Sequence, residues 1–141
     1  MSEEQSEVAA DVWRRMSDLV LDNDRRRHVS YALGLSFIRV TVLRHVAQAP
    51  LTLRELSGAL GIDPPYATVV VHDLSERGLV ERLPHPTDRR AKLVTLTPAG
   101  RAAAERAESL LREPPAGLVA LPADQLRELA RVLAAVSPVT L

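Results

Sequence analysis

The feature that most constrains this chain is a change of hydrophobic periodicity at Gly78. Before it, residues 63–77 have the pattern of an amphipathic helix, with an aspartate suited to the N-cap, a proline at the first helical position and apolar residues at three- and four-residue steps. After it, residues 79–83 and 92–96 are predicted as two short strands joined by a polar, turn-rich segment. A helix that leads directly into a hairpin predicts a mainly α-helical fold with a small β element.

Two shorter helices are predicted upstream. The segment 36–49 begins with a serine suited to the N-cap, carries apolar residues at helical spacing and is followed by a proline. Thr52 and Glu55 then have the T-x-x-E spacing of a capping box, ahead of a helix that a glycine ends at position 61. Helices joined by a tight turn and followed by a basic hairpin have the order of a winged helix-turn-helix. We therefore expect such a domain over residues 35–100, with its recognition helix over 63–77 and its wing over 79–96.

The two ends of the chain are predicted to form a dimer. Residues 1–34 are expected to form one N-terminal helix ended by Gly34, and residues 101–141 to contain two helices separated by a Pro-Pro pair. Both ends carry apolar stripes that a middle domain of this size cannot fully cover, so a second copy of the chain is the expected partner. The positions assigned to this interface are Val8, Val12, Leu126, Leu129, Leu133 and Val136.

The distribution of charge points to nucleic acid, although the whole chain is neutral. Eighteen Lys and Arg balance eighteen Asp and Glu. Residues 1–24 carry two Arg and seven acids, a net charge of −5, whereas residues 77–101 carry six cations and two acids, a net charge of +4. Because Lys and Arg bind phosphates, the hairpin is the expected contact with double-stranded DNA.

Composition excludes several other classes of protein. The chain has no cysteine, so it can have no disulfide, no thiolate nucleophile and no thiol redox sensor. It has no nucleophile elbow, phosphate-binding loop or cluster of metal ligands, so we expect neither an enzyme nor a metal or other cofactor. No apolar run approaches the ~18 residues of a membrane helix, and the acidic N-terminus lacks the order of a signal peptide. A cytoplasmic protein without a membrane partner is the expectation.

The outer face of the predicted recognition helix contains the candidate base contacts. Thr68 and His72 are expected at base edges, and Val69 at a thymine methyl group. Tyr66, on a flank, is better placed for a phosphate, and the helix N-terminus adds its positive dipole end. The full set of expected DNA-binding residues is Pro65, Tyr66, Thr68, Val69, His72, Arg77, Arg82, His85, Asp88, Arg89, Arg90 and Lys92.

The tip of the hairpin combines two arginines with one acid. A two-stranded projection can place an arginine in a minor groove, whose narrow, negative channel suits a guanidinium group. Asp88 beside Arg89 and Arg90 is out of place on a surface that meets DNA. Its expected role is internal, as a carboxylate that folds the loop and directs an arginine outward.

The chain resembles the MarR family of bacterial regulators over about residues 35–101. The resemblance is most specific in Gly-Leu-Val-Glu-Arg at 78–82 and in the stretch 88–100, which has the family's D-x-R wing followed by the L-T-x-x-G start of the next helix. It implies that Asp88 fixes the wing and that Arg90 reaches DNA. It also implies a homodimer held by the first and last helices, which binds a pseudo-palindromic operator. Many members release DNA when a small, often aromatic or phenolic, ligand binds, so a ligand-released repressor is the expected function.

The chain departs from the family pattern in the recognition helix. Members usually carry arginines there, at the positions of Val69 and Asp73, whereas this helix has no basic residue before Arg77. This departure motivates an alternative, a winged-helix protein-interaction module that has lost sequence-specific DNA reading. The alternative predicts that Arg89 and Arg90 can be removed without consequence for partner binding.

Three of the four aromatic residues are candidates for an effector cavity. Trp13, Tyr31 and Phe37 could line a site for a small aromatic ligand, or could be ordinary core or dimer-interface residues. The sequence leaves both interpretations open.

Overall fold

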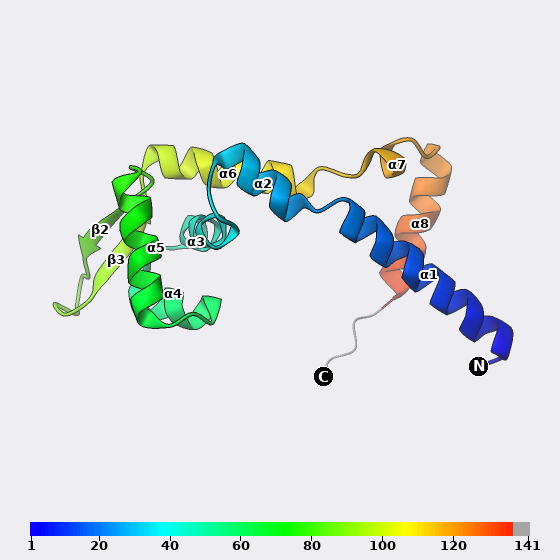
Figure 1. Ribbon diagram of the computed structural model, residues 1–141, viewed down its shortest axis with the longest axis horizontal. Coiled ribbons are helices and arrows are strands. Elements are labelled where there is room, and N and C mark those ends of the chain that lie inside the picture. The colour runs from blue at the N-terminus through cyan, green and yellow to red at the C-terminus, as the bar shows by residue number, and fades with distance from the viewer. Residues whose placement is uncertain (137–141) are drawn as a thin grey trace.

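The computed structural model describes residues 1–136, and the last five residues of the predicted C-terminal segment 101–141 lie outside the described part (Figure 1). The fold is mainly α-helical with one small antiparallel sheet, as the sequence predicts. Its elements in chain order are α1 (Glu3–Asp22), α2 (Arg25–Leu33), α3 (Phe37–Gln48), β1 (Leu51–Thr52), α4 (Leu53–Leu60), α5 (Pro64–Glu76), β2 (Val80–Pro84), β3 (Lys92–Leu96), α6 (Pro98–Arg112), α7 (Ala116–Val119) and α8 (Ala123–Ala135).

The winged domain is built around the buried face of α5. Apolar residues at helical spacing on this face are almost fully inaccessible to solvent, and they pack with α3, α4 and the sheet. The members of this stripe are Ala67, Val70, Val71 and Leu74. Because one face of α5 is buried, the opposite face is the one left for a ligand.

The sheet has one more strand than the hairpin predicts. Its order is β1-β3-β2, with Leu51 opposite Val94 in one pairing and Val80 opposite Leu96 in the other. A two-residue strand such as β1 is too short to show an alternating pattern in the sequence. Its pairing with β3, which is distant in sequence, is what defines it as a strand. The strand predicted over 79–83 begins and ends one residue later, and the one predicted over 92–96 is confirmed.

The expectation of one continuous helix over residues 1–34 is wrong. The chain breaks at Asn23, and Asp24 starts a new helix because its carboxylate accepts the backbone N–H groups of Arg26 and Arg27. The second helix ends as expected at Gly34, whose φ of 64° is a left-handed conformation that favours glycine. The short helix α7 within the predicted break after α6 is likewise an addition to the sequence prediction.

The wing is attached to the rest of the domain by a clamp between two backbone segments, residues 78–79 and 97–100. The hydroxyl of Thr97 donates to the carbonyl of Gly78 (2.6 Å) and accepts the N–H of Gly100 (3.0 Å), while the Thr97 N–H donates to the carbonyl of Leu79 (3.1 Å). Gly78 itself has a φ of 73°, which a side chain would disfavour. The clamp joins the end of α5 to the start of α6 and so closes the hairpin at its base.

The terminal helices extend away from the winged domain. Neither α1 nor α8 contains a buried residue, although both are amphipathic, and Figure 1 shows them on the side of the molecule opposite to the wing. Their exposed apolar residues include Val8, Val12, Trp13, Leu133 and Val136. The sequence prediction that the two ends carry uncovered stripes is confirmed for the single chain.

Replacing Gly100 by Ala is expected to destabilise the domain by about 1–3 kcal/mol, the usual cost of overpacking. A Cβ atom at this position would lie 1.9 Å from the carbonyl oxygen of Leu79, so the clamp would have to open. Urea unfolding measures the effect, and Gly58→Ala, on an open stretch of α4, is the control that should keep or increase stability. Equal stability of Gly100→Ala and the parent chain would contradict the clamp.

Candidate nucleic-acid interface

The exposed face of α5 contains the residues that the sequence assigns to base contact. The helix starts at Asp63, whose carboxylate accepts the N–H of Tyr66 at 2.8 Å, and a proline follows at its first position. Opposite the buried stripe, Pro65, Thr68, Val69 and His72 are all exposed. The structure thus brings these predicted residues together on one surface.

Two side chains on this face are engaged locally. The hydroxyl of Thr68 donates to the carbonyl of Pro64, one turn earlier, at 3.0 Å. The His72 ring lies between two charged neighbours, with Nδ1 3.5 Å from Arg82 Nη2 and Nε2 3.9 Å from a Glu76 carboxylate oxygen. Since Arg82 belongs to β2, this contact links the wing to the C-terminal half of the recognition helix.

Arg77, a predicted DNA contact, is 47% exposed and pairs with neighbouring groups of the protein. Its Nε lies 2.9 Å from the Asp73 carboxylate, which also pairs with Arg39 of α3 at 2.7 Å. A second nitrogen of Arg77 donates to the carbonyl of Gly34 at 3.4 Å. Hydrogen bonds from Arg39 and then Arg77 lower the pKa of Asp73 from its usual value. Asp73 therefore ties α5 to α3 and pairs with the arginine that ends the helix.

The wing loop is folded by hydrogen bonds from its own residues. The Asp88 carboxylate accepts the backbone N–H of Arg90 at 3.0 Å, an internal contact of the kind expected for this acid. The His85 ring, expected to face DNA, instead directs Nδ1 into the loop, where it accepts the N–H groups of Thr87 (3.2 Å) and Asp88 (3.0 Å). These bonds hold the loop backbone and leave the side chains of Arg89, Arg90 and Lys92 exposed.

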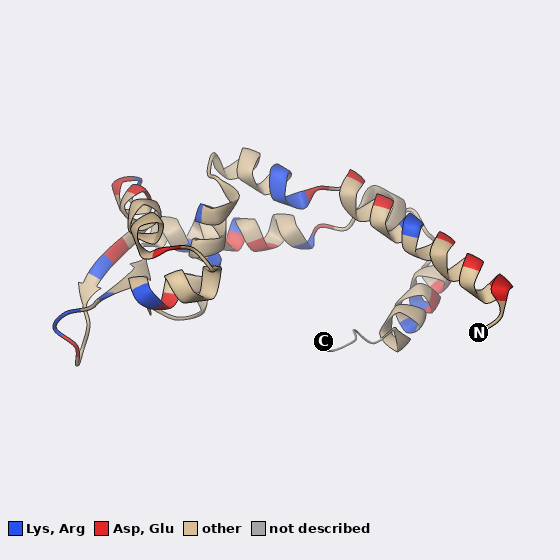
Figure 2. Cartoon of the chain, turned by 60° about the horizontal axis from the view of Figure 1, so that its bottom comes forward, with Lys and Arg blue, Asp and Glu red and all other residues tan. Residues whose placement is uncertain are grey.

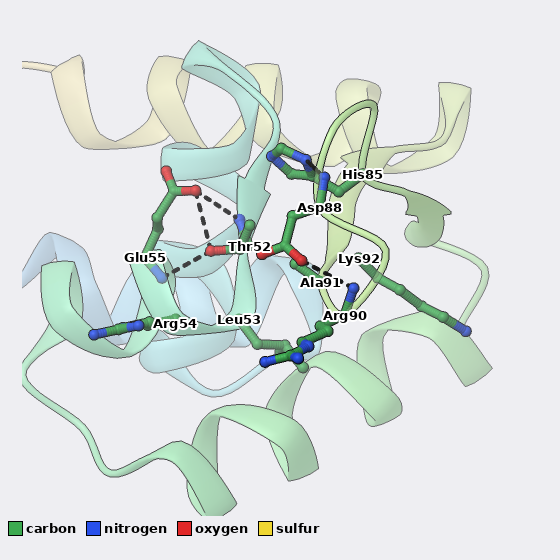
Figure 3. Close-up of a pocket in the computed structure, with 9 residues that line it drawn as sticks. All are labelled: Thr52, Leu53, Arg54, Glu55, His85, Asp88, Arg90, Ala91 and Lys92. Carbon is green, nitrogen blue, oxygen red and sulfur yellow. Dashed lines mark hydrogen bonds between the residues drawn. The ribbon is translucent and has the colours of Figure 1, made fainter.

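A depression of about 660 Å³ separates the wing loop from the start of α4 (Figure 3). Three cations line it: Arg54, which the sequence analysis did not assign to DNA, together with Arg90 and Lys92. Its two acids are both occupied, since Glu55 closes the capping box of α4 and Asp88 folds the loop. The capping pattern of residues 52–60 does not predict this position for Arg54, because the wing that lies beside it is distant in sequence.

The three candidate effector residues lie apart in the single chain. Trp13 is on the extended α1, and 68% of its surface is exposed. Tyr31 is 90% exposed and lines a shallow depression beside the end of α1, whereas Phe37 is partly buried beneath the Arg26 guanidinium, 5.3 Å from the ring centre. A larger hollow, of about 510 Å³, lies where the α1–α2 break meets the end of α6, and it contains none of the three.

Charge separates the two parts of the molecule. Figure 2 shows acids along α1 and cations on the strands and loop of the wing. Over residues 1–136, no group of three or more His, Cys, Asp or Glu side chains could hold a metal ion. Among the helices of that same stretch, none is both long and apolar enough to cross a membrane.

Comparison with known proteins agrees with this architecture. Residues 33–91 match the MarR family. An HTH-type transcriptional repressor of Mycobacterium tuberculosis, Rv2887, is 36% identical over 103 residues, which cover 72% of this chain and 74% of the repressor. The crystal structure of apo MarR from Escherichia coli superposes with a TM-score of 0.66 at 29% identity, over 89% of this chain and 96% of MarR.

The YusO protein of Bacillus subtilis shares the fold, with a TM-score of 0.76 over 95% of this chain and 96% of YusO at 18% identity. The extent of the match to the mycobacterial repressor, together with the winged helix-turn-helix and the D-x-R wing, establishes the family. This chain belongs to the MarR family of winged-helix transcriptional regulators.

Proposed function

We propose that the chain acts as a homodimeric repressor that binds a pseudo-palindromic DNA operator and is released by a small-molecule ligand. The observation that carries the proposal is the construction of the wing, whose loop is folded by Asp88 and His85 so that Arg89, Arg90 and Lys92 remain exposed, while Arg82 of β2 contacts His72 on the outer face of α5. A helix and a cationic hairpin side by side fit a major groove and the adjacent minor groove.

The DNA contacts fall into two groups. The wing cations, with Arg54 at the start of α4, supply phosphate and minor-groove contacts. The outer face of α5 supplies base contacts through Thr68, Val69 and His72. Asp88 and His85 act by shaping the loop. Arg77 is left out of the proposed contacts because Asp73 holds it.

The dimer is supported by the terminal helices. Their apolar stripes are exposed or half-buried in the single chain, and burying them on a second copy removes that surface from water. A two-fold axis would place two recognition helices about one DNA turn, ~34 Å, apart. The proposed interface residues are those of the stripes on α1 and α8, Val8, Val12, Leu126, Leu129, Leu133 and Val136.

Release by a ligand requires that the ligand bind the two states of the dimer differently. The hollow at the α1–α2 break is lined by the end of α1, the start of α2, the end of α6 and α7, so a bound aromatic molecule would change the relative position of the N-terminal and C-terminal helices. Aromatic or phenolic molecules titrated into a preformed complex with DNA should lower the fraction bound.

One observation favours the alternative of a protein-interaction module. The helix α5 carries no Lys or Arg, so the usual arginine contacts to bases are absent from it. The two functions differ in their response to salt and to loss of the wing arginine.

Replacing Arg90 by Ala should weaken binding to every DNA sequence by about 10- to 100-fold, since one charge-assisted contact is lost. The slope of log affinity against log salt should fall by about 1. Fluorescence anisotropy at several salt concentrations measures both. Arg112→Ala, at the end of α6 away from the wing, is the matched control. A parent chain with no salt-sensitive affinity for DNA, including the region upstream of its own gene, would overturn the proposed function.

Replacing Leu133 by Glu should convert the dimer to a monomer, because it places a charge in the apolar stripe of α8. Sedimentation velocity at micromolar concentration measures the change. Arg127→Glu alters charge on the same helix outside the stripe and should remain dimeric. If the parent chain sediments as a monomer, or the Leu133 variant as a dimer, the terminal helices do not form the proposed interface.

A further inference from the structure

The recognition helix lacks the side chain that most often specifies a base. The commonest specific contact in the major groove is a bidentate Arg or Lys on guanine O6 and N7. Between Pro64 and Glu76 there is neither residue. The N-terminal residues of a recognition helix are those that meet base edges, and here they belong to this stretch without Lys or Arg.

The cations nearest to the helix are already committed. Arg39 and Arg77 both pair with Asp73, at 2.7 and 2.9 Å. Arg82, from the wing, lies beside His72 in the C-terminal half of the helix. Base contacts from the first two turns of α5 must therefore come from side chains other than Lys and Arg.

What these turns present is mainly apolar. Val69 is 58% exposed at the centre of the outer face, one turn after Pro65. Thr68 donates its hydroxyl hydrogen to the carbonyl of Pro64, so it offers DNA a methyl group and an acceptor but no donor. The only apolar group in the major groove is the C5-methyl of thymine.

We propose that the recognition helix reads thymine methyl groups, with Val69 as the principal specificity residue and the Thr68 methyl group as a second contact. Each half-site then contains thymines beneath the first two turns of α5, and most of the affinity comes from the wing cations. The inference rests on the proposed DNA-binding function and adds to it the chemistry of the base that is recognised.

The test starts from half-sites selected out of random DNA by the intact dimer at a fixed salt concentration. In the selected operator each thymine is replaced, one at a time, by deoxyuridine, which removes the C5-methyl group and keeps the base pair. We expect a loss of affinity of about fourfold at each thymine that Val69 or Thr68 contacts, the value for exposing one buried methyl group. Replacements in the flanking DNA should have no effect.

A double-mutant cycle assigns the contact to a residue. In Val69→Ala the penalty for deoxyuridine at the contacted thymine should disappear, because the valine methyl groups that meet it are gone. Val119→Ala, an exposed valine on α7, should keep the penalty of the parent chain. Circular dichroism of Val69→Ala should match the parent chain, since this side chain is not part of the core.

Three results would overturn the inference. The first is that the selected half-sites contain guanine or cytosine, and not thymine, beneath the first two turns of α5, which is the result expected if His72 dominates the base contacts. Deoxyuridine could be tolerated at every thymine, or its penalty could persist in Val69→Ala. In each case DNA would still be bound in a salt-dependent way and the proposed function would stand. Absence of any salt-sensitive DNA binding would instead overturn both.

Discussion

The structure depends on the clamp that Thr97 and Gly100 form with Gly78 and Leu79. The end of the recognition helix, the base of the wing and the start of α6 meet at these four residues. A glycine at 100 allows the close approach, because a Cβ would occupy the space of the Leu79 carbonyl oxygen. The clamp keeps the wing beside α5. The position of the wing relative to the outer face of α5 is therefore fixed.

Charge is arranged so that acids near the interface act within the protein. The carboxylates of three acids accept hydrogen bonds from neighbouring groups: Asp73 in an ion pair between α5 and α3, Asp88 in the wing loop and Glu55 in the cap of α4. Their negative charges are thereby offset close to where they lie, while the wing cations remain available to solvent. A chain of zero net charge can in this way present a cationic surface to DNA, while α1 carries six of its eighteen acids.

The terminal helices give the molecule a second uncovered surface with different chemistry. The wing surface is cationic and suits a polyanion, whereas α1 and α8 expose apolar side chains that suit a second copy of the chain. Arg39 and Asp73 connect the recognition helix to α3, and α3 in turn packs against α6, which continues toward the terminal helices. A change in the relative position of two terminal segments therefore has a continuous packed route to the recognition helix.

Most of the features that could be predicted from the sequence depend on neighbours within about four residues. The caps at Asp63, Thr52 and Thr97, the buried stripe of α5 and the role of Asp88 were all predictable, since their hydrogen bonds and helical periodicity are local. Which cations pair with an acid and which remain unpaired depends on the tertiary structure, because the two members of an ion pair can be distant in sequence. Asp73, for example, lies 34 residues from Arg39. The tertiary structure also paired β1 with β3 and brought Arg54 to the wing, contacts that only chain folding creates.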